Sequence, residues 1–296
     1  MNHIKKLMFL SLSLLLFSCE DVIEVSVDQK QVKLVVDAFV NNLDTTQTIR
    51  LTRSIPYFQK SGTEPTVTDA TVIIADTSNL KVFPFTHTQD GIYTWTPNKS
   101  TGDTFVVGRS YALFIIQGGD TLISITKLNP TVNAIDSIIT VPTEGNGPPN
   151  AGPGKYIELH ANDLPGKGNF YWIKTFRNDT FYGATRNLNI SQDMGNTSNG
   201  QDGELFIYPI RFNALNEFFR PFRDGEKVRI EIHSISLESF YWFNLIVNES
   251  NNGGLFSTPP VNIQTNIFSF NPNKKIGIAG LFSMSAVRYK ELIIKE

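Results

Sequence analysis

Short runs of β-branched, aromatic and aliphatic residues, separated by polar turn material, recur along most of this chain. Seven such runs lie between residues 32 and 130: VKLVVDAFV, TIRLTRS, ATVIIAD, LKVFPFT, GIYTWTP, SYALFII and DTLISIT. Runs of this kind predict strands, and spacers such as DTSN and TQDG predict turns. Gly118, Gly119 and Asp120 predict a hairpin between the last two runs. The spacing is typical of a β-sandwich, so residues 32–130 predict an N-terminal sandwich domain.

A segment rich in proline and glycine follows this region. Residues 141–156, VPTEGNGPPNAGPGKY, contain four glycines and four prolines, and we interpret residues 131–155 as a linker or loop. A phosphate-binding loop is the alternative, but Pro149 stands where its first glycine would be. Residues 156–296 then predict a second β-rich, sandwich-like domain. Its strands include NFYWIKTFRN, ELFIYPIRF and GEKVRIEIHSIS, with a hairpin tip at Asn178-Asp179.

One helix is expected in this second region, near residues 237–250. Ser236 predicts its N-cap, Glu238 lies in its first turn, and the Asn-Asn-Gly of residues 251–253 predicts its end. Large apolar residues occur on more than one side of this helix, so we expect more than one side to be covered: Leu237, Phe240, Tyr241 and Leu245, then Trp242, Phe243 and Ile246. The closing residues, KKIGIAGLFSMSAVRYKELII, predict two strands that complete the second sheet.

The N-terminus predicts a lipoprotein signal peptide over residues 1–18. Two lysines precede the apolar run Leu7 to Phe17, which is too short for the roughly 20 residues that span a bilayer. The tetrapeptide ending in Ser18-Cys19 resembles a bacterial lipobox, although Phe17 is bulkier than the usual residue there. Cys19 would then be acylated and become the first mature residue. The alternative is a free thiol in an uncleaved helix.

Acylation of Cys19 would anchor the protein in a membrane, with residues 19–31 as a tether, because two or more acyl chains hold a protein stably on a bilayer.

Cys19 is the only cysteine, so no internal disulfide can form and no Cys-x-x-Cys zinc site is available. The formal net charge is −2, which argues against a nucleic-acid partner. We expect no cofactor and no metal.

No local motif predicts a reaction. After the signal peptide the histidines are His87, His160 and His233, and none has a second ligand at metal-binding spacing. The segment around Ser283 departs from G-x-S-x-G, because no glycine follows the serine. A triad assembled from distant residues stays open. We therefore expect a non-enzymatic protein, with an unrecognised hydrolase as one alternative.

The loop at residues 191–204 offers oxygen ligands of the kind that calcium prefers, but its spacing misses the calcium-loop pattern and suits an ordinary turn. These ligands are Asp193, Asn196, Asn199, Asp202 and Glu204.

Aromatic residues beside arginines are a more informative signal, because both are frequent in interfaces. They occur in the segment NEFFRPFRDGE, and core packing is the alternative for its aromatic side chains. Tyr57 and Phe58, which follow a strand, either close the end of the sandwich or face a partner. The candidate partner or ligand surface therefore comprises Tyr57, Phe58, Phe218, Phe219, Arg220, Phe222 and Arg223.

Several segments occur in the order seen in one known family: SCEDVIEV, KLVVDAFVNN, IRLTRSIPYF, VTDATVIIAD, GIYTW, VGRSYAL, IHSISLESFYWFN, FSTPPVNI and IAGLFSMSAVRYKELII. From Cys19 to about Ile294 the chain resembles the Bacteroidetes outer-membrane lipoproteins of domain of unknown function 4249. The resemblance implies an immunoglobulin- or transthyretin-like sandwich followed by a second β-rich domain. It also implies genes beside TonB-dependent outer-membrane receptors, and it assigns no catalytic residues.

Two functions follow as expectations. One is an accessory lipoprotein that binds or presents cargo beside a TonB-dependent transporter; the other is an adhesive or scaffold sandwich that binds glycan or protein without a role in uptake. In such bacteria, acidic residues after the lipidated cysteine resemble a signal for export to the cell surface, and Glu20 and Asp21 match it in character. Ordinary solvated tether residues are the alternative.

Overall fold

The computed structural model describes residues 32–55, 64–144, 146–182, 185, 188–195, 202–254, 257–259, 261–271 and 277–295. The predictions on the signal peptide, the tether, Cys19, Glu20, Asp21, Tyr57 and Phe58 fall outside these residues. From Val32 onward the chain forms one compact unit, and it is mainly β, as predicted. None of the described helices is long and apolar enough to cross a membrane.

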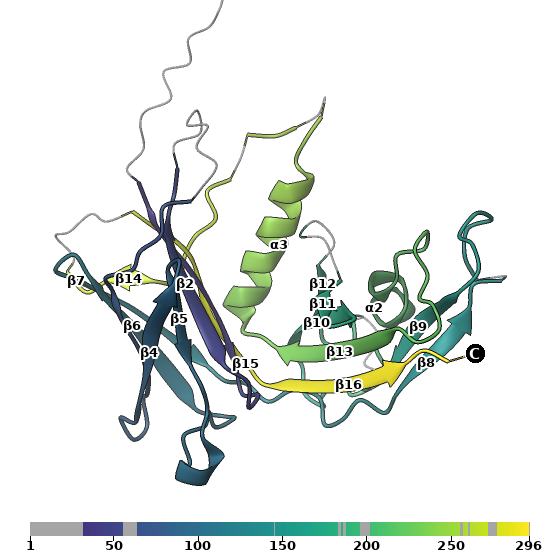
Figure 1. Cartoon of the computed structure of the whole chain (residues 1–296), viewed down its shortest axis with the longest axis horizontal. Helices are drawn as coiled ribbons and strands as arrows, with labels where there is room; N and C mark the ends of the chain where they lie inside the picture. The colour runs from purple at the N-terminus through teal and green to yellow at the C-terminus, as the bar shows by residue number, and fades with distance from the viewer. Residues whose placement is uncertain are drawn as a thin grey trace, which may run out of the picture. The chain divides into compact units, whose positions relative to one another are not determined.

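The larger sheet has nine strands in the order β14-β7-β6-β3-β4-β5-β2-β1-β15 (Figure 1). Its strands are β1 (Leu34–Asn41), β2 (Gln47–Arg53), β3 (Thr71–Asp76), β4 (Val82–Gln89), β5 (Ile92–Trp95), β6 (Ser110–Gln117), β7 (Asp120–Lys127), β14 (Phe268–Ser269) and β15 (Ile278–Ser285). A short 3-10 helix, η1 (Lys99–Thr101), follows β5.

Strand β4 folds this sheet into two facing layers. Its first half pairs with β3, its second half pairs with β5, and a bulge lies between His87 and Gln89. One core is shared by both layers: Val36 of β1 and Ile49 of β2 lie in the same cluster as Val72 of β3. The expected sandwich architecture is therefore present. The choice between immunoglobulin and transthyretin types stays a prediction.

Local turn chemistry forms the hairpins as expected. Gln117 pairs with Asp120 across Gly118 and Gly119, whose positive φ angles of 61° and 72° suit a two-residue turn. The tip at Asn178 and Asp179 likewise has positive φ at both residues and joins β10 to β11. Both hairpin predictions are confirmed.

The second sheet has the order β11-β10-β13-β16, with β12 also paired to β10, and a separate ladder joins β8 to β9. These strands are β8 (Ser137–Pro142), β9 (Lys155–His160), β10 (Phe170–Arg177), β11 (Thr180–Phe181), β12 (Asn189–Gln192), β13 (Lys227–Ser234) and β16 (Val287–Ile293). Residues 137–142, expected to be linker, are thus a strand, because β9 lies antiparallel beside them. The segment ELFIYPIRF is not a strand: it contains helix α2 (Tyr208–Arg211), followed by the 3-10 helix η3 (Asn213–Leu215).

The closing strands divide between the two sheets, which corrects the expectation that both complete the second. Strand β15 lies parallel to β1 in the nine-stranded sheet, and only β16 joins β13. Gly280 permits the close approach of β15 to β1, because a Cβ atom there would lie 1.9 Å from the carbonyl oxygen of Val36. Ala286 is the single residue between β15 and β16, so the chain passes directly from one sheet to the other.

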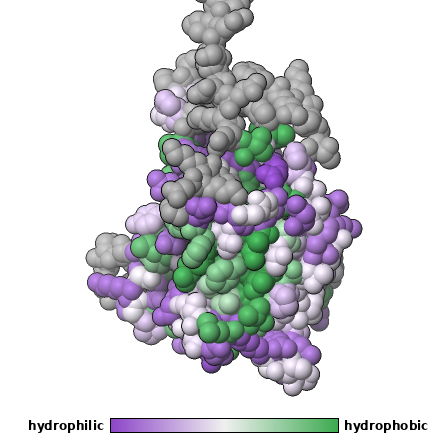
Figure 2. Space-filling view, turned by 90° about the vertical axis from the view of Figure 1, so that its left-hand side faces the viewer, coloured by the Kyte–Doolittle hydropathy of each residue, from purple (hydrophilic) through white to green (hydrophobic). Residues whose placement is uncertain are grey.

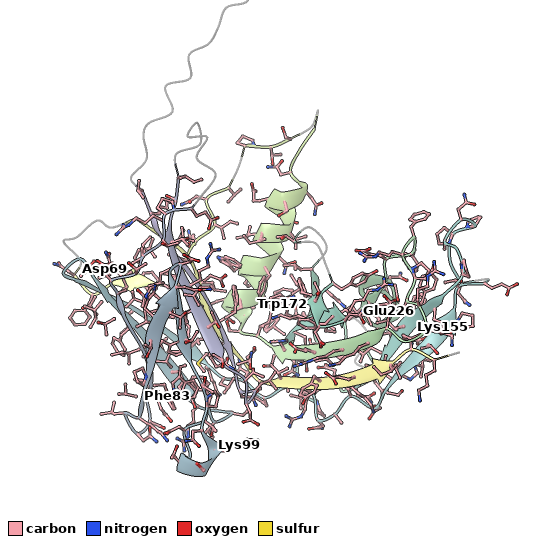
Figure 3. The ribbon with its side chains drawn as sticks, in the orientation of Figure 1. Asp69, Phe83, Lys99, Lys155, Trp172 and Glu226 are labelled. Carbon is pink, nitrogen blue, oxygen red and sulfur yellow. The ribbon has the colours of Figure 1, made fainter. Side chains whose placement is uncertain are left out.

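The predicted helix is α3 (Leu237–Asn251), and the Ser236 hydroxyl accepts a hydrogen bond from the backbone N–H of Ser239, as expected of an N-cap. Only Ser239 and Phe243 are fully buried on α3, whereas Leu237 and Tyr241 are exposed. Phe240 contacts Phe170 of β10, and Trp242 contacts Phe39 of β1. The helix is therefore covered by strands of both sheets, as expected, and is open on the side that carries Leu237 and Tyr241. Its buried side contacts β10, β12 and β15, and Trp172 of β10 lies near it (Figure 3).

Candidate functional site

The outward face of strands β3, β4, β6, β7 and β14 is apolar. Side chains on paired strands form a continuous row across all five: Pro84, Ile73, Phe114, Ile123 and Phe268. A second row beside it runs through Val82, Ala75, Ala112 and Ile125. Figure 2 views the side of the molecule on which β4, β6 and β7 lie, and apolar residues gather there. We call the residues of these two rows the apolar face.

This face departs from the pattern of a solvated sheet. An antiparallel sheet with one solvated face alternates apolar and polar residues, and strands with continuous apolar runs are usually buried on both faces. Strand β6 carries the run YALFII, and β3 carries VIIA. Within the described ranges the outer side remains open, since Ile125 is 58% exposed and Phe268 is 62% exposed. Exposed apolar patches of this kind mark interaction sites.

A groove of about 630 Å³ adjoins the apolar face and shares Ile123, Ile125 and Phe268 with it. Its opposite wall is the exposed side of α3, through Tyr241, Trp242 and Leu245. The volume lies within the range of ligand-binding clefts, and the lining is mainly apolar with a few polar groups. Those polar groups include Ser124, Glu238 and Gln264.

The predicted aromatic and arginine surface is only partly a surface. Phe222 is 1% exposed and packs in the core of the second sheet, with the guanidinium of Arg177 4.8 Å from its ring centroid. Phe218 is half-buried, 5.3 Å from the ring centroid of Tyr156. Phe222 therefore has to be removed from the candidate surface, because the turn that carries it is held inward by the bond of its N–H to the Lys155 carbonyl.

Phe219, Arg220 and Arg223 remain on the surface, and Phe219 is 75% exposed. Their side chains belong to neither the apolar face nor the groove. The aromatic and arginine segment therefore predicted some exposed residues, but it did not indicate the larger apolar face. The non-alternating runs in β3 and β6 were the signal that could have revealed it.

A buried polar cluster joins the two sheets beneath α3. His233 of β13 lies between Glu231, at 2.7 Å from Nε2 to Oε2, and Ser285 of β15, at 2.9 Å from Nδ1 to Oγ. Glu231 was not predicted as a neighbour of His233, although residues two apart on a strand share a face. Lys174 lies nearby, with its ammonium 3.8 Å from the Trp172 ring centroid.

The charges of this cluster follow from its burial. Burial, assisted by the charge of Lys174, lowers the pKa of His233 to about 4, so the imidazole is neutral near pH 7. Burial also lowers the pKa of Lys174 to about 8, against the opposing charges of Glu231 and Asp37. Burial acts to raise the pKa of Glu231, but its bond to His233 and the nearby cations hold that pKa below its usual value.

Serine, histidine and glutamate in this order are the components of a hydrolase triad. The cavity beside them is only about 20 Å³, which is room for one water molecule rather than a substrate. The arrangement therefore serves as a polar link between β13 and β15. Among the described residues, no group of three or more His, Cys, Asp or Glu side chains is arranged to hold a metal ion.

The calcium-type loop is only partly described, since residues 196–201 lie outside the described ranges. The carboxylate of Asp193 accepts hydrogen bonds from the backbone N–H groups of Gly168 and Asn169, and that of Asp202 accepts one from Gly166. These two carboxylates therefore organise the preceding turn. They give no support to calcium as the alternative to an ordinary turn.

Fold and site together define a class: a mainly β protein whose described residues leave an apolar face open beside a groove. The chain matches the family model described as Domain of unknown function (DUF4249) over residues 20–291, and it belongs to that family. No curated protein matches the chain.

Proposed function

We propose that this chain is a non-enzymatic lipoprotein, anchored in the outer membrane through Cys19, that binds or presents cargo beside a TonB-dependent transporter. The observation that carries the proposal is the apolar face, which is exposed in the described chain and continuous with the groove. A sheet with two apolar faces is stable in water when a partner covers the second face, at least part of the time.

The size of the apolar face suits a partner held nearby. Five strands about 4.8 Å apart make a face roughly 20 Å wide, or a few hundred Å² of apolar surface. A stable complex between freely diffusing proteins usually buries about 800 Å² on each partner. Anchoring both partners in one membrane raises their effective concentration, so a smaller contact is sufficient.

The acyl chains of Cys19 would supply that anchoring, since each buried CH₂ contributes about 0.8 kcal/mol. Glu20 and Asp21 support display on the cell surface, because they match the acidic character of an export signal. Proteinase treatment of whole cells tests the display: digestion of the protein is expected, and full protection would place it on the periplasmic side.

Isolation from native membranes in mild detergent tests the partnership. We expect a TonB-dependent barrel to be recovered with the wild-type lipoprotein and to be lost with Ile125→Lys, which places a charge where the apolar face borders the groove. Ile139→Lys is the matched control, because Ile139 is also exposed but lies on β8, away from this face. Intact lipoprotein recovered without any barrel would refute the transporter role and leave the adhesive or scaffold function.

A further inference from the structure

The outer edge of β7 is only partly paired. Strand β14 covers Leu122 and Ile123, and the Phe270 N–H donates to the Thr121 carbonyl at 2.7 Å. Neither β14 nor any other described strand continues along Ile125 and Lys127. Such an edge is a template for a further strand.

The direction of the free backbone groups follows from the hairpin. Gln117 and Asp120 close the β6–β7 ladder, and Leu128 exchanges backbone bonds with Gly108 and Arg109 on the β6 side. Alternate residues of an antiparallel strand bond to opposite neighbours. The even-numbered residues of β7 therefore face β6, while the N–H and C=O of Ile125 point outward along the edge that borders the groove.

A buried hydroxyl at the groove also lacks a partner. Ser124 lines the groove and is 2% exposed, yet its Oγ makes no hydrogen bond in the described chain. Buried polar groups are nearly always paired, so this hydroxyl indicates that a polar group of a ligand belongs beside it. An aliphatic chain could not supply that group.

Two charged side chains lie near the free edge. The Glu238 carboxylate lines the groove on α3, and the Lys127 ammonium lies at the end of β7. Both are exposed, and neither forms an ion pair within the described residues. A ligand with a positive group beside Glu238 and a negative group beside Lys127 would complement both.

We infer that the groove binds an extended peptide segment, which adds a strand to the free edge of β7. Its backbone bonds to Ile125, its small aliphatic side chains lie against Trp242 and Leu245, and its charged groups oppose those of Glu238 and Lys127. This is the β-augmentation mode of recognition, in which backbone bonds give affinity and alternate side chains enter a pocket. The inference deepens the proposed function, because it states the chemistry of what this site binds.

A peptide fits these features better than two other ligand classes. A fatty acyl chain would fill the apolar lining but leave the Ile125 backbone and the Ser124 hydroxyl unpaired. A glycan would meet aliphatic side chains, such as Ile123, Ile125 and Leu245, over much of its hydroxylated surface. Only an extended peptide offers backbone donors and acceptors together with apolar side chains.

Fluorescence polarisation with the purified full chain in detergent tests the inference. The probes are two labelled, end-blocked peptides, Lys-Thr-Val-Ser-Val-Thr-Val-Glu and Glu-Thr-Val-Ser-Val-Thr-Val-Lys, which place the charges in both orders. We expect one of them to bind in the micromolar range and its backbone N-methylated form to bind at least about tenfold more weakly. Binding of neither peptide, or binding of palmitate or maltoheptaose alone, would overturn the inference.

Two variants separate strand addition from general damage. Ile125→Pro removes an outward N–H that does not serve β6, so we expect unchanged thermal unfolding and about tenfold weaker peptide binding. Ser124→Ala is expected to weaken binding without lowering stability, whereas Ile125→Val is expected to bind as the wild type does. Undiminished binding by folded Ile125→Pro would overturn strand addition. The polarisation assay contains no transporter. If the peptide binds but no transporter is recovered from native membranes, the proposed partnership is refuted and the peptide inference stands.

Discussion

Substitution of Gly280 by alanine tests the least expected feature of the fold, the parallel placement of β15 on β1. Gly280 has φ = 98°, and an added Cβ would lie 1.9 Å from the Val36 carbonyl oxygen. The backbone conformation alone costs a non-glycine residue about 1–3 kcal/mol. Forcing the two strands apart costs roughly 1–3 kcal/mol more, as for other overpacked sites. We therefore expect Gly280→Ala to lower the free energy of unfolding by about 2–6 kcal/mol, a large share of a typical 5–15 kcal/mol.

Gly108→Ala is the matched control for this experiment. Gly108 has φ = 92°, but a Cβ there would meet nothing within 4 Å. It carries the same conformational cost without the contact, so the difference between the two variants isolates the approach of β15 to β1. Equilibrium urea unfolding, followed by tryptophan fluorescence, measures both. Equal losses in the two variants would refute the placement of β15.

Three further predictions concern titration and anchoring. Burial raises the pKa of Asp163 to about 6, so the folded state loses stability as the pH rises from about 4 to 6. Asp163→Asn is therefore expected to raise the free energy of unfolding by up to about 3 kcal/mol at pH 8 but by little at pH 4. The pKa of His233 is lowered to about 4, so the free energy of unfolding falls by up to about 3 kcal/mol as the pH falls from about 6.5. His233→Gln is expected to flatten this part of the plot of stability against pH. Urea unfolding across pH 4–8 measures both, and parallel wild-type and variant profiles would contradict them. Cys19→Ala is expected in the soluble fraction after cell lysis; its recovery in membranes would contradict lipid anchoring.

Local patterns predicted most strands and both tight hairpins, because the information needed for them lies within a few residues. Gly118-Gly119 and Asn178-Asp179 require positive φ, and their flanking strands are adjacent in sequence. The pairing of β15 with β1 joins residues about 240 positions apart, as in Val36 with Gly280. Both are apolar strands of similar length, and nothing in either segment specifies its neighbour. Sheet membership was therefore not predictable from local sequence.

The candidate site was predictable only in part for the same reason. The apolar runs of β3 and β6 lie in the sequence, and they indicate strands with two apolar faces. Glu231 and His233 could also be placed on one face of β13 from their spacing. Their partner Ser285 is on a strand of the other sheet, and the groove depends on how α3 lies against β7. Neither relation has a local signature.

The groove takes its two walls from the two different sheets. Strand β7 belongs to the nine-stranded sheet, whereas only two residues separate the start of α3 at Leu237 from the end of β13 in the second sheet. Links between the sheets therefore affect the distance between the walls: Ala286 joins β15 to β16, His233 of β13 bonds to Ser285 of β15, and the Ser239 hydroxyl of α3 donates to that of Ser283 on β15. Buried polar links of this kind are directional, and unlike apolar contacts they fix one arrangement of the packed elements. The buried cluster that resembles a catalytic triad thus helps to hold α3 in place and, with it, the width of the groove.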